Sequence, residues 1–125
     1  MAIELQDLTH EIIGGALEVH KTLGPGLLET AYEQCLCHEL SLRGLSFQRE
    51  IPLPVTYRGV KLDCGYRMDM VVENSVVVEL KCVDVLLAVH EAQLLTYLKL
   101  GCCKVGLLFN FNEAKLMDGF RRLIL

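Results

Sequence analysis

Two charged residues, Glu79 and Lys81, interrupt an apolar segment at positions 76–81. Because successive side chains of a strand point to opposite faces, this spacing predicts that both lie on one face of a sheet. A segment this rich in valine is expected to be central in its sheet, where an unpaired charge is costly. The pattern therefore indicates either an ion pair or a site that holds a ligand.

A second carboxylate, Asp69, lies in the preceding apolar segment, and its position depends on the turn between the two segments. A three-residue loop would pair Val72 with Val76 and set Asp69 opposite Glu79, whereas a two-residue loop would set it opposite Leu80. Opposed residues have Cβ atoms about 4.5–5.5 Å apart, so two facing carboxylates need a shared proton or a cation. Carboxylate oxygens converging from two strands suit Mg²⁺ or Mn²⁺.

The same residues leave a structural alternative open. Glu79 could pair with Lys81, and Asp69 with Arg67, on a solvated face of the sheet. Structural ion pairs collect acids and bases just as active sites do, so these residues alone do not decide between the two interpretations.

Two predicted helices contribute further candidates. Gln93 and Tyr97 are four residues apart in the helix expected at 88–100, so both project from one face. Glu29 lies in the first turn of the helix expected at 27–43, directly after a Gly-Pro-Gly break. Taken singly, a Gln/Tyr pair is typical of a helix surface, and an acid in a first turn is typical of helix-dipole compensation.

The remaining elements follow from hydrophobic periodicity, which changes from helical to alternating near residue 45. Helices are expected at 8–23, 27–43 and 88–100, and strands at 47–51, 55–58, 64–72, 76–82 and 104–109. The tail at 113–125 fits either a short helix or a last strand. No repeat or linker divides the chain, so we expect one α/β (α+β) domain over residues 1–125.

Composition restricts the class of protein. With 125 residues, of which 52% are hydrophobic, the chain can fill a core, and no apolar run is long enough for a membrane span. The acidic start lacks the pattern of a signal peptide, and the six cysteines show no CxxC spacing, so free thiols in the cytoplasm are expected. A net charge of -4 means that nucleic-acid binding would need a local basic patch or bound metal ions. The high apolar content also favours a homodimer.

Taken in order, Gly-x-x-Glu, Asp, Glu-x-Lys and Gln-x-x-x-Tyr resemble the motifs of the PD-(D/E)xK nuclease superfamily. Within it, the chain looks like the small bacterial GxxExxxR proteins. The resemblance covers about residues 8–125 and rests on four segments: 24–29, 78–81, 93–98 and 110–112. One departure is clear, because the arginine that names the subfamily, four residues after Glu29, is Glu33 here.

The resemblance implies a restriction-endonuclease-like core: a central mixed sheet flanked by helices, in αβββαβ order, with an extra N-terminal helix. The metal ligands it implies for one or two Mg²⁺ or Mn²⁺ ions are Asp69, Glu79, the Leu80 carbonyl and Glu29. Lys81 would orient or deprotonate the attacking water, or stabilise charge on the phosphate. Gln93 and Tyr97 would position the nucleic-acid strand or the water.

The expected function is therefore metal-dependent hydrolysis of phosphodiester bonds in DNA or RNA, with DNA favoured. One alternative is a catalytically silent module that keeps the nuclease fold and binds nucleic acid or a protein partner. Another is a hydrolase of small phosphodiesters or nucleotides that uses the same ions. No membrane partner is expected.

Overall fold

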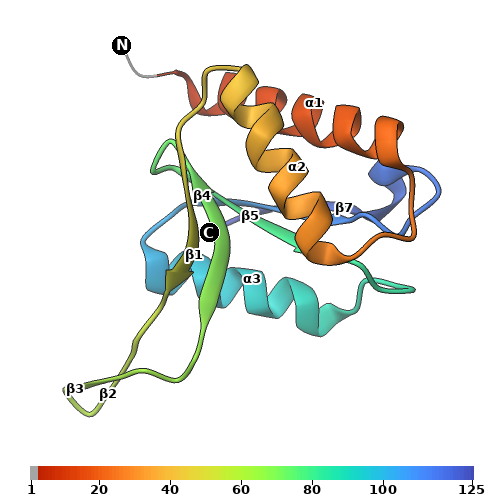
Figure 1. The fold of residues 1–125 in the computed structure, drawn as a ribbon. Coiled ribbons are helices and arrows are strands. Elements are labelled where there is room, and N and C mark those ends of the chain that lie inside the picture. The colour runs from red at the N-terminus through yellow and green to blue at the C-terminus, as the bar shows by residue number, and fades with distance from the viewer. Residues whose placement is uncertain (1–2) are drawn as a thin grey trace.

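A five-stranded mixed sheet between helices forms the centre of the computed structural model, which describes residues 3–125 (Figure 1). The helices are α1 (Leu5–Leu23), α2 (Glu29–Leu42), α3 (Ala88–Gly101) and the short 3-10 helix η1 (Leu116–Gly119). The strands are β1 (Phe47–Pro52), β2 (Val55–Tyr57), β3 (Val60–Leu62), β4 (Arg67–Val72), β5 (Val76–Lys81), β6 (Val105–Asn110) and β7 (Phe120–Ile124). The sheet order is β1-β4-β5-β6-β7, and only β5 and β6 run parallel.

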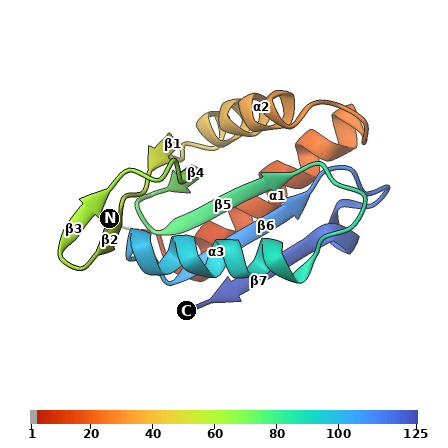
Figure 2. The same ribbon diagram turned by 90° about the horizontal axis from the view of Figure 1, so that it is seen from below.

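Helices cover both faces of this sheet because its central strands are apolar on both sides (Figure 2). Val76, Val78 and Leu80 of β5 belong to the core shared with α1 and α2. Val77 faces the other way and belongs to the core shared with α3, where it lies with Leu94. Glu79 alternates with the first set, as Val77 does, so its side chain is directed to the α3 side.

The architecture confirms the predicted fold class. Helix α2, strands β1, β4 and β5, helix α3 and strand β6 follow one another in αβββαβ order, and α1 is the extra N-terminal helix. The ambiguous tail contains both candidates, a 3-10 turn followed by β7, which pairs with β6 and closes that edge of the sheet.

The strand expected at 55–58 is present as β2, which pairs with β3 in a separate two-stranded sheet and not with the central one. Its turn, Arg58-Gly59, has φ of 49° and 79°, the positive pair that a tight two-residue hairpin requires. The sequence prediction missed β3 and also began the following strand at Cys64, three residues before Arg67.

The helix boundaries differ from prediction by a few residues, since α1 begins at Leu5 and α2 at Glu29. Among residues 3–125, no helix is long and apolar enough to cross a membrane.

Candidate active site

Strands β4 and β5 bring the two predicted carboxylates together. Val72 pairs with Val76, the register that a three-residue loop predicts. Beyond the last paired residues, side chains replace the regular ladder: the Asp69 N–H donates to Oε1 of Glu79 at 2.9 Å, and the Leu80 N–H donates to Oδ2 of Asp69 at 2.9 Å. Each carboxylate is thus held by the backbone of the opposite strand, so their relative position is fixed.

Burial raises the pKa of both carboxyl groups, and the negative charge of Asp69 adds to the shift at Glu79. Glu79 is only 4% exposed, and burial, followed by the negative charge of Asp69, raises its pKa to about 9. Burial likewise raises the pKa of Asp69, against the opposing effects of the Leu80 N–H and the Lys81 ammonium. The metal-free pair therefore holds a proton at neutral pH, which is the condition under which a cation is an effective substitute.

A tyrosine hydroxyl positions the third carboxylate, Glu29. Tyr32 is fully buried and stacks on Phe111 with ring centroids 4.6 Å apart. Its hydroxyl donates to the Gly24 carbonyl and accepts the Leu27 N–H at 3.1 Å. The Gly-Pro-Gly break is thereby fastened to the core, and α2 begins at Glu29 directly after it.

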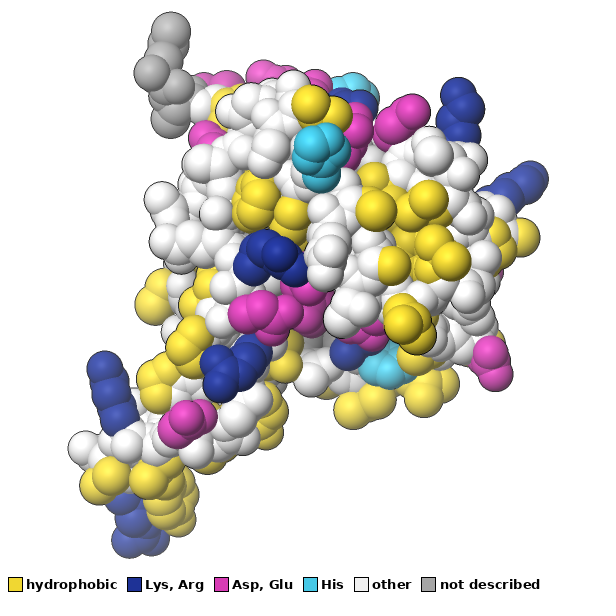
Figure 3. All heavy atoms as spheres, in the orientation of Figure 1, with side chains coloured by type: hydrophobic (Ala, Val, Ile, Leu, Met, Phe, Trp, Pro, Cys, Tyr) yellow, Lys and Arg dark blue, Asp and Glu magenta, His cyan; other side chains and the backbone are white. Residues whose placement is uncertain are grey.

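Glu29 lies within the electric field of the carboxylate pair. Its pKa is raised mainly by burial and next by the charge of Asp69, while Lys81 lowers it. Acidic side chains gather in the middle of the face seen in Figure 3. However, among residues 3–125 no three His, Cys, Asp or Glu side chains are arranged as a metal-binding group, so Glu29 is a neighbour of the pair rather than part of a closed cluster.

Lys81 ends β5 two residues beyond Glu79 and on the same face. The segment after it is fixed by the buried Asn110, whose Nδ2 donates to the Val83 carbonyl at 2.8 Å and whose Oδ1 accepts the Val83 N–H at 3.1 Å. Lys81 lowers the pKa of both Asp69 and Glu79, yet within the described part of the chain it forms no ion pair. The structural alternative of a Glu79–Lys81 ion pair is therefore not what the structure contains.

Helix α3 places the Gln/Tyr pair beside the same carboxylates. Gln93 Nε2 donates to the Tyr97 hydroxyl at 2.9 Å. Tyr97 is 4% exposed, and its pKa is raised by burial and then by the charges of Glu79 and Asp69. The edge of its ring also meets Tyr66, with centroids 6.3 Å apart. The two α3 residues thus lie on the side of the sheet to which Glu79 is directed.

The sequence prediction missed a fourth carboxylate, Glu50. It occupies the β1 position opposite Asp69, between the pairs Arg49–Met70 and Ile51–Met68. Its backbone φ of 50° is unusual for a residue other than glycine. Its charge raises the pKa of Asp69 and of Glu29. Only the pairing of β1 with β4 reveals this position, because the arm of residues 53–66 separates the two strands in the sequence.

Arg49 and Glu33 form a second feature that the sequence did not reveal. Arg49 Nη2 lies 3.2 Å from Oε2 of Glu33, which is 4% exposed, and the other Glu33 oxygen is buried with no hydrogen-bond partner among residues 3–125. Burial raises the pKa of Glu33, while the Arg49 hydrogen bond lowers it. Where the GxxExxxR motif has an arginine, α2 therefore carries Glu33, and the guanidinium of Arg49 reaches this position from β1.

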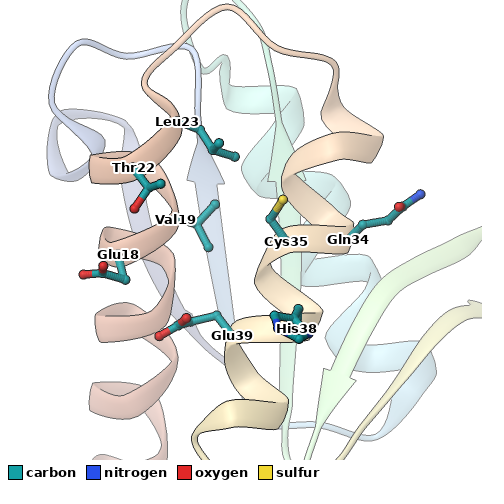
Figure 4. A pocket seen from close by; sticks show the side chains of 8 residues that line it. All are labelled: Glu18, Val19, Thr22, Leu23, Gln34, Cys35, His38 and Glu39. Atoms are coloured by element: carbon teal, nitrogen blue, oxygen red, sulfur yellow. The ribbon is translucent and has the colours of Figure 1, made fainter.

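A hollow of about 360 Å³ lies between α1 and α2, away from the carboxylate pair (Figure 4). Val19, Leu23, Cys35 and His38 line it, while Gln34 points outward. Its lining is mainly apolar, and it has no convergent set of charged groups, so we assign it no chemistry.

The arrangement as a whole places carboxylate oxygens from two strands close to an ammonium group and a tyrosine. A family model described as the PD-(D/E)XK nuclease superfamily matches residues 6–123. No curated protein and no solved structure gives a significant match. The matched range includes every residue of the site described above.

Proposed function

Because the chain belongs to the PD-(D/E)XK nuclease superfamily, we propose that it is a metal-dependent nuclease that hydrolyses phosphodiester bonds of nucleic acid. The observation that carries this proposal is the pair formed by the half-buried Asp69 and the buried Glu79, each held by a backbone N–H of the other strand. Two carboxylates kept together at this burial repel one another unless a proton or a cation lies between them.

The donor set fits Mg²⁺ or Mn²⁺, since it consists of carboxylate and carbonyl oxygens. Asp69, Glu79 and the Leu80 carbonyl would hold the ion, and Glu29 would reach it directly or through a water. When bound, a divalent ion would offset the carboxylate charges, activate water and neutralise charge on the scissile phosphate.

The other residues act around that ion. Lys81, kept in place by the segment that Asn110 fixes, would orient the attacking water or receive its proton, or would stabilise charge on the phosphate. Gln93 and Tyr97 would donate hydrogen bonds that position the strand or the water. Arg49, with one nitrogen on Glu33, has further donors to offer a backbone phosphate.

Four finer assignments belong to the same proposal. The Gly26-x-x-Glu29 motif supports the GxxExxxR subfamily, with Arg49 in place of the missing arginine. The restriction-endonuclease-like core supports DNA in preference to RNA. Six free thiols support the cytoplasm, where cysteines stay reduced. Exposed leucines on and beside α1 and α2, including Leu28 at 77% and Leu42 at 69%, support a homodimer of one-domain chains.

A second candidate function is a silent binding module that keeps the fold without turnover. It is favoured by one observation, that no three-ligand group is assembled among residues 3–125. In that case the proton held by Glu79, and not a metal ion, would relieve the repulsion between Glu79 and Asp69.

A cleavage assay separates the two. Labelled single-stranded DNA, duplex DNA and RNA are incubated with Mn²⁺, with Mg²⁺ and with EDTA, using the unaltered protein, Lys81→Ala and the matched control Lys99→Ala on exposed α3 surface. A nuclease yields metal-dependent product that Lys81→Ala abolishes and Lys99→Ala retains. Absence of product from all three substrates, together with a thermal shift on addition of metal, would establish the binding module instead.

A further inference from the structure

A two-stranded arm projects from the body of the protein. Strands β2 and β3 pair with each other and are not hydrogen-bonded to the central sheet (Figures 1 and 2). Five of their six strand residues are exposed, and Val55 is half-buried. Because an isolated hairpin is only marginally stable in water, an arm of this kind gains most when a partner lies against it.

The arm has a composition unlike that of the rest of the chain. Within residues 53–66 it carries two cations, Arg58 and Lys61, against one acid, Asp63, and Arg67 follows at the start of β4, in a protein whose net charge is -4. Figure 3 shows basic and apolar side chains together along the arm, and acidic ones in the middle of the same face. This local positive charge suits a polyanion, which the protein as a whole would repel.

Aromatic rings accompany these cations. Tyr57 is 62% exposed, and the Arg58 guanidinium lies 5.7 Å from the centre of its ring. Tyr66, at the base of the arm, is 42% exposed. Cations that follow a phosphate backbone, combined with aromatic rings on which bases stack, are the means by which proteins hold single-stranded nucleic acid.

The base of the arm adjoins the candidate active site. Tyr66 meets Tyr97, and a hollow of about 380 Å³ lined by both, with His90 and Gln93, lies beside them. Asp69 follows only two residues after β4 begins. A single strand of nucleic acid whose scissile phosphate lies at the carboxylate pair can therefore pass the hollow and continue along the arm. At about 3.3 Å per residue, the arm reaches at most about 30 Å beyond Asp69.

We infer that the β2–β3 arm binds the single strand of a nucleic-acid substrate beside the cleaved bond, with Tyr57 and Tyr66 stacking on bases and Arg58 and Lys61 contacting phosphates. This inference rests on the proposed function, because it takes the cleaved bond to lie at Asp69. It adds a binding surface of defined chemistry to a site that is itself acidic.

The test measures binding separately from cleavage. Fluorescence anisotropy of a labelled 20-nucleotide strand is recorded with Mn²⁺ in a Lys81→Ala background, so that the strand is not consumed. An 8-nucleotide strand and a 20-base-pair duplex serve as comparisons. All arm and control variants are compared in melting temperature with the Lys81→Ala background, and no change is expected because the further substituted side chains are exposed.

Arg58→Glu with Lys61→Glu is expected to lower affinity for the 20-nucleotide strand at least tenfold and to reduce the slope of log K against log salt by about 1.4. Tyr57→Ala is expected to lower affinity about tenfold. Lys21→Glu with Lys104→Glu, exposed cations outside the arm, makes the same change in charge and is expected to lower affinity less than twofold.

Three results would overturn the inference: equal losses in the arm and control variants, tighter binding of the duplex than of the strand, or a change of oligomeric state caused only by the arm variants. The last would mean that a second copy of the chain covers the arm. If the unaltered protein never cleaves yet binds the strand through the arm, the proposed function fails, and only the assignment of the arm as a surface that binds single strands stands. If it cleaves and the arm variants bind normally, the inference alone fails.

Discussion

Replacing Glu79 by glutamine should change how the stability of the metal-free protein depends on pH. The pKa of Glu79 is about 9 in the folded protein, against an ordinary value of 4.5. Between these values the carboxyl group is ionised in the unfolded chain and protonated in the folded one, so the folded state binds one more proton. Its stabilising contribution is complete below pH 4.5 and is lost as pH rises through the folded pKa.

The magnitude follows from one proton. The free energy of unfolding falls by about 1.4 kcal/mol for each pH unit in this window, hence by about 2.7 kcal/mol between pH 6 and pH 8. The amide introduced by Glu79→Gln would keep an oxygen for the Asp69 N–H and would face the Asp69 carboxylate with its NH₂ group, much as the protonated acid does. The variant has no proton to lose at this position, so its free energy of unfolding should not fall for this reason. The difference in free energy of unfolding between the variant and the unaltered protein should therefore change by about 2.7 kcal/mol in favour of the variant between pH 6 and pH 8.

Urea denaturation in EDTA at pH 6, 7 and 8 measures this difference. Glu18→Gln, on the exposed side of α1, is the matched control and should follow the unaltered protein throughout. Parallel pH dependence of Glu79→Gln and the unaltered protein would refute the reasoning, because it would mean that Glu79 is ionised in the folded state.

Three further outcomes are expected. Mn²⁺ at pH 8 should raise the melting temperature of the unaltered protein but not of Asp69→Asn, which loses both a ligand and a charge; scanning fluorimetry with Mn²⁺ and with EDTA measures this. Lys81→Ala should abolish metal-dependent cleavage on a gel while retaining the Mn²⁺ shift. Tyr32→Phe should lower the free energy of unfolding by about 1–2 kcal/mol in urea, because the Gly24 carbonyl and the Leu27 N–H both lose their partner.

Controls for these outcomes come from the same chain. Asp118→Asn, an exposed acid in η1, should keep the Mn²⁺ shift, and Tyr57→Phe, on the exposed arm, should leave stability within about 0.5 kcal/mol. An equal Mn²⁺ shift in Asp69→Asn would place the metal elsewhere, and full activity in Lys81→Ala would remove that residue from the mechanism.

The part of the site that the sequence predicts is the part that local geometry determines. Asp69 faces Glu79 because a three-residue loop and strand alternation leave one register, and Gln93 reaches Tyr97 because four residues make about one helical turn. The fold class follows in the same way, from hydrophobic periodicity and the order of the elements.

What the sequence does not predict depends on contacts between distant segments. Glu50 faces Asp69 only because β1 pairs with β4 across the whole arm, and Glu33 meets Arg49 only because the tertiary fold brings a side chain of β1 to α2. Strand β3 escaped prediction because all three of its residues are exposed, so no buried face imposes an alternating pattern on it.

The most direct test of the metal-dependent site is a crystal of the protein soaked in Mn²⁺ at pH 8 and examined by anomalous diffraction. We expect an anomalous peak between the carboxylates of Asp69 and Glu79, within about 2.0–2.6 Å of oxygens from both. The same soak of a Glu79→Gln crystal should show a weaker peak or none. Ordered Asp69 and Glu79 side chains with no peak between them would contradict a metal site at this pair.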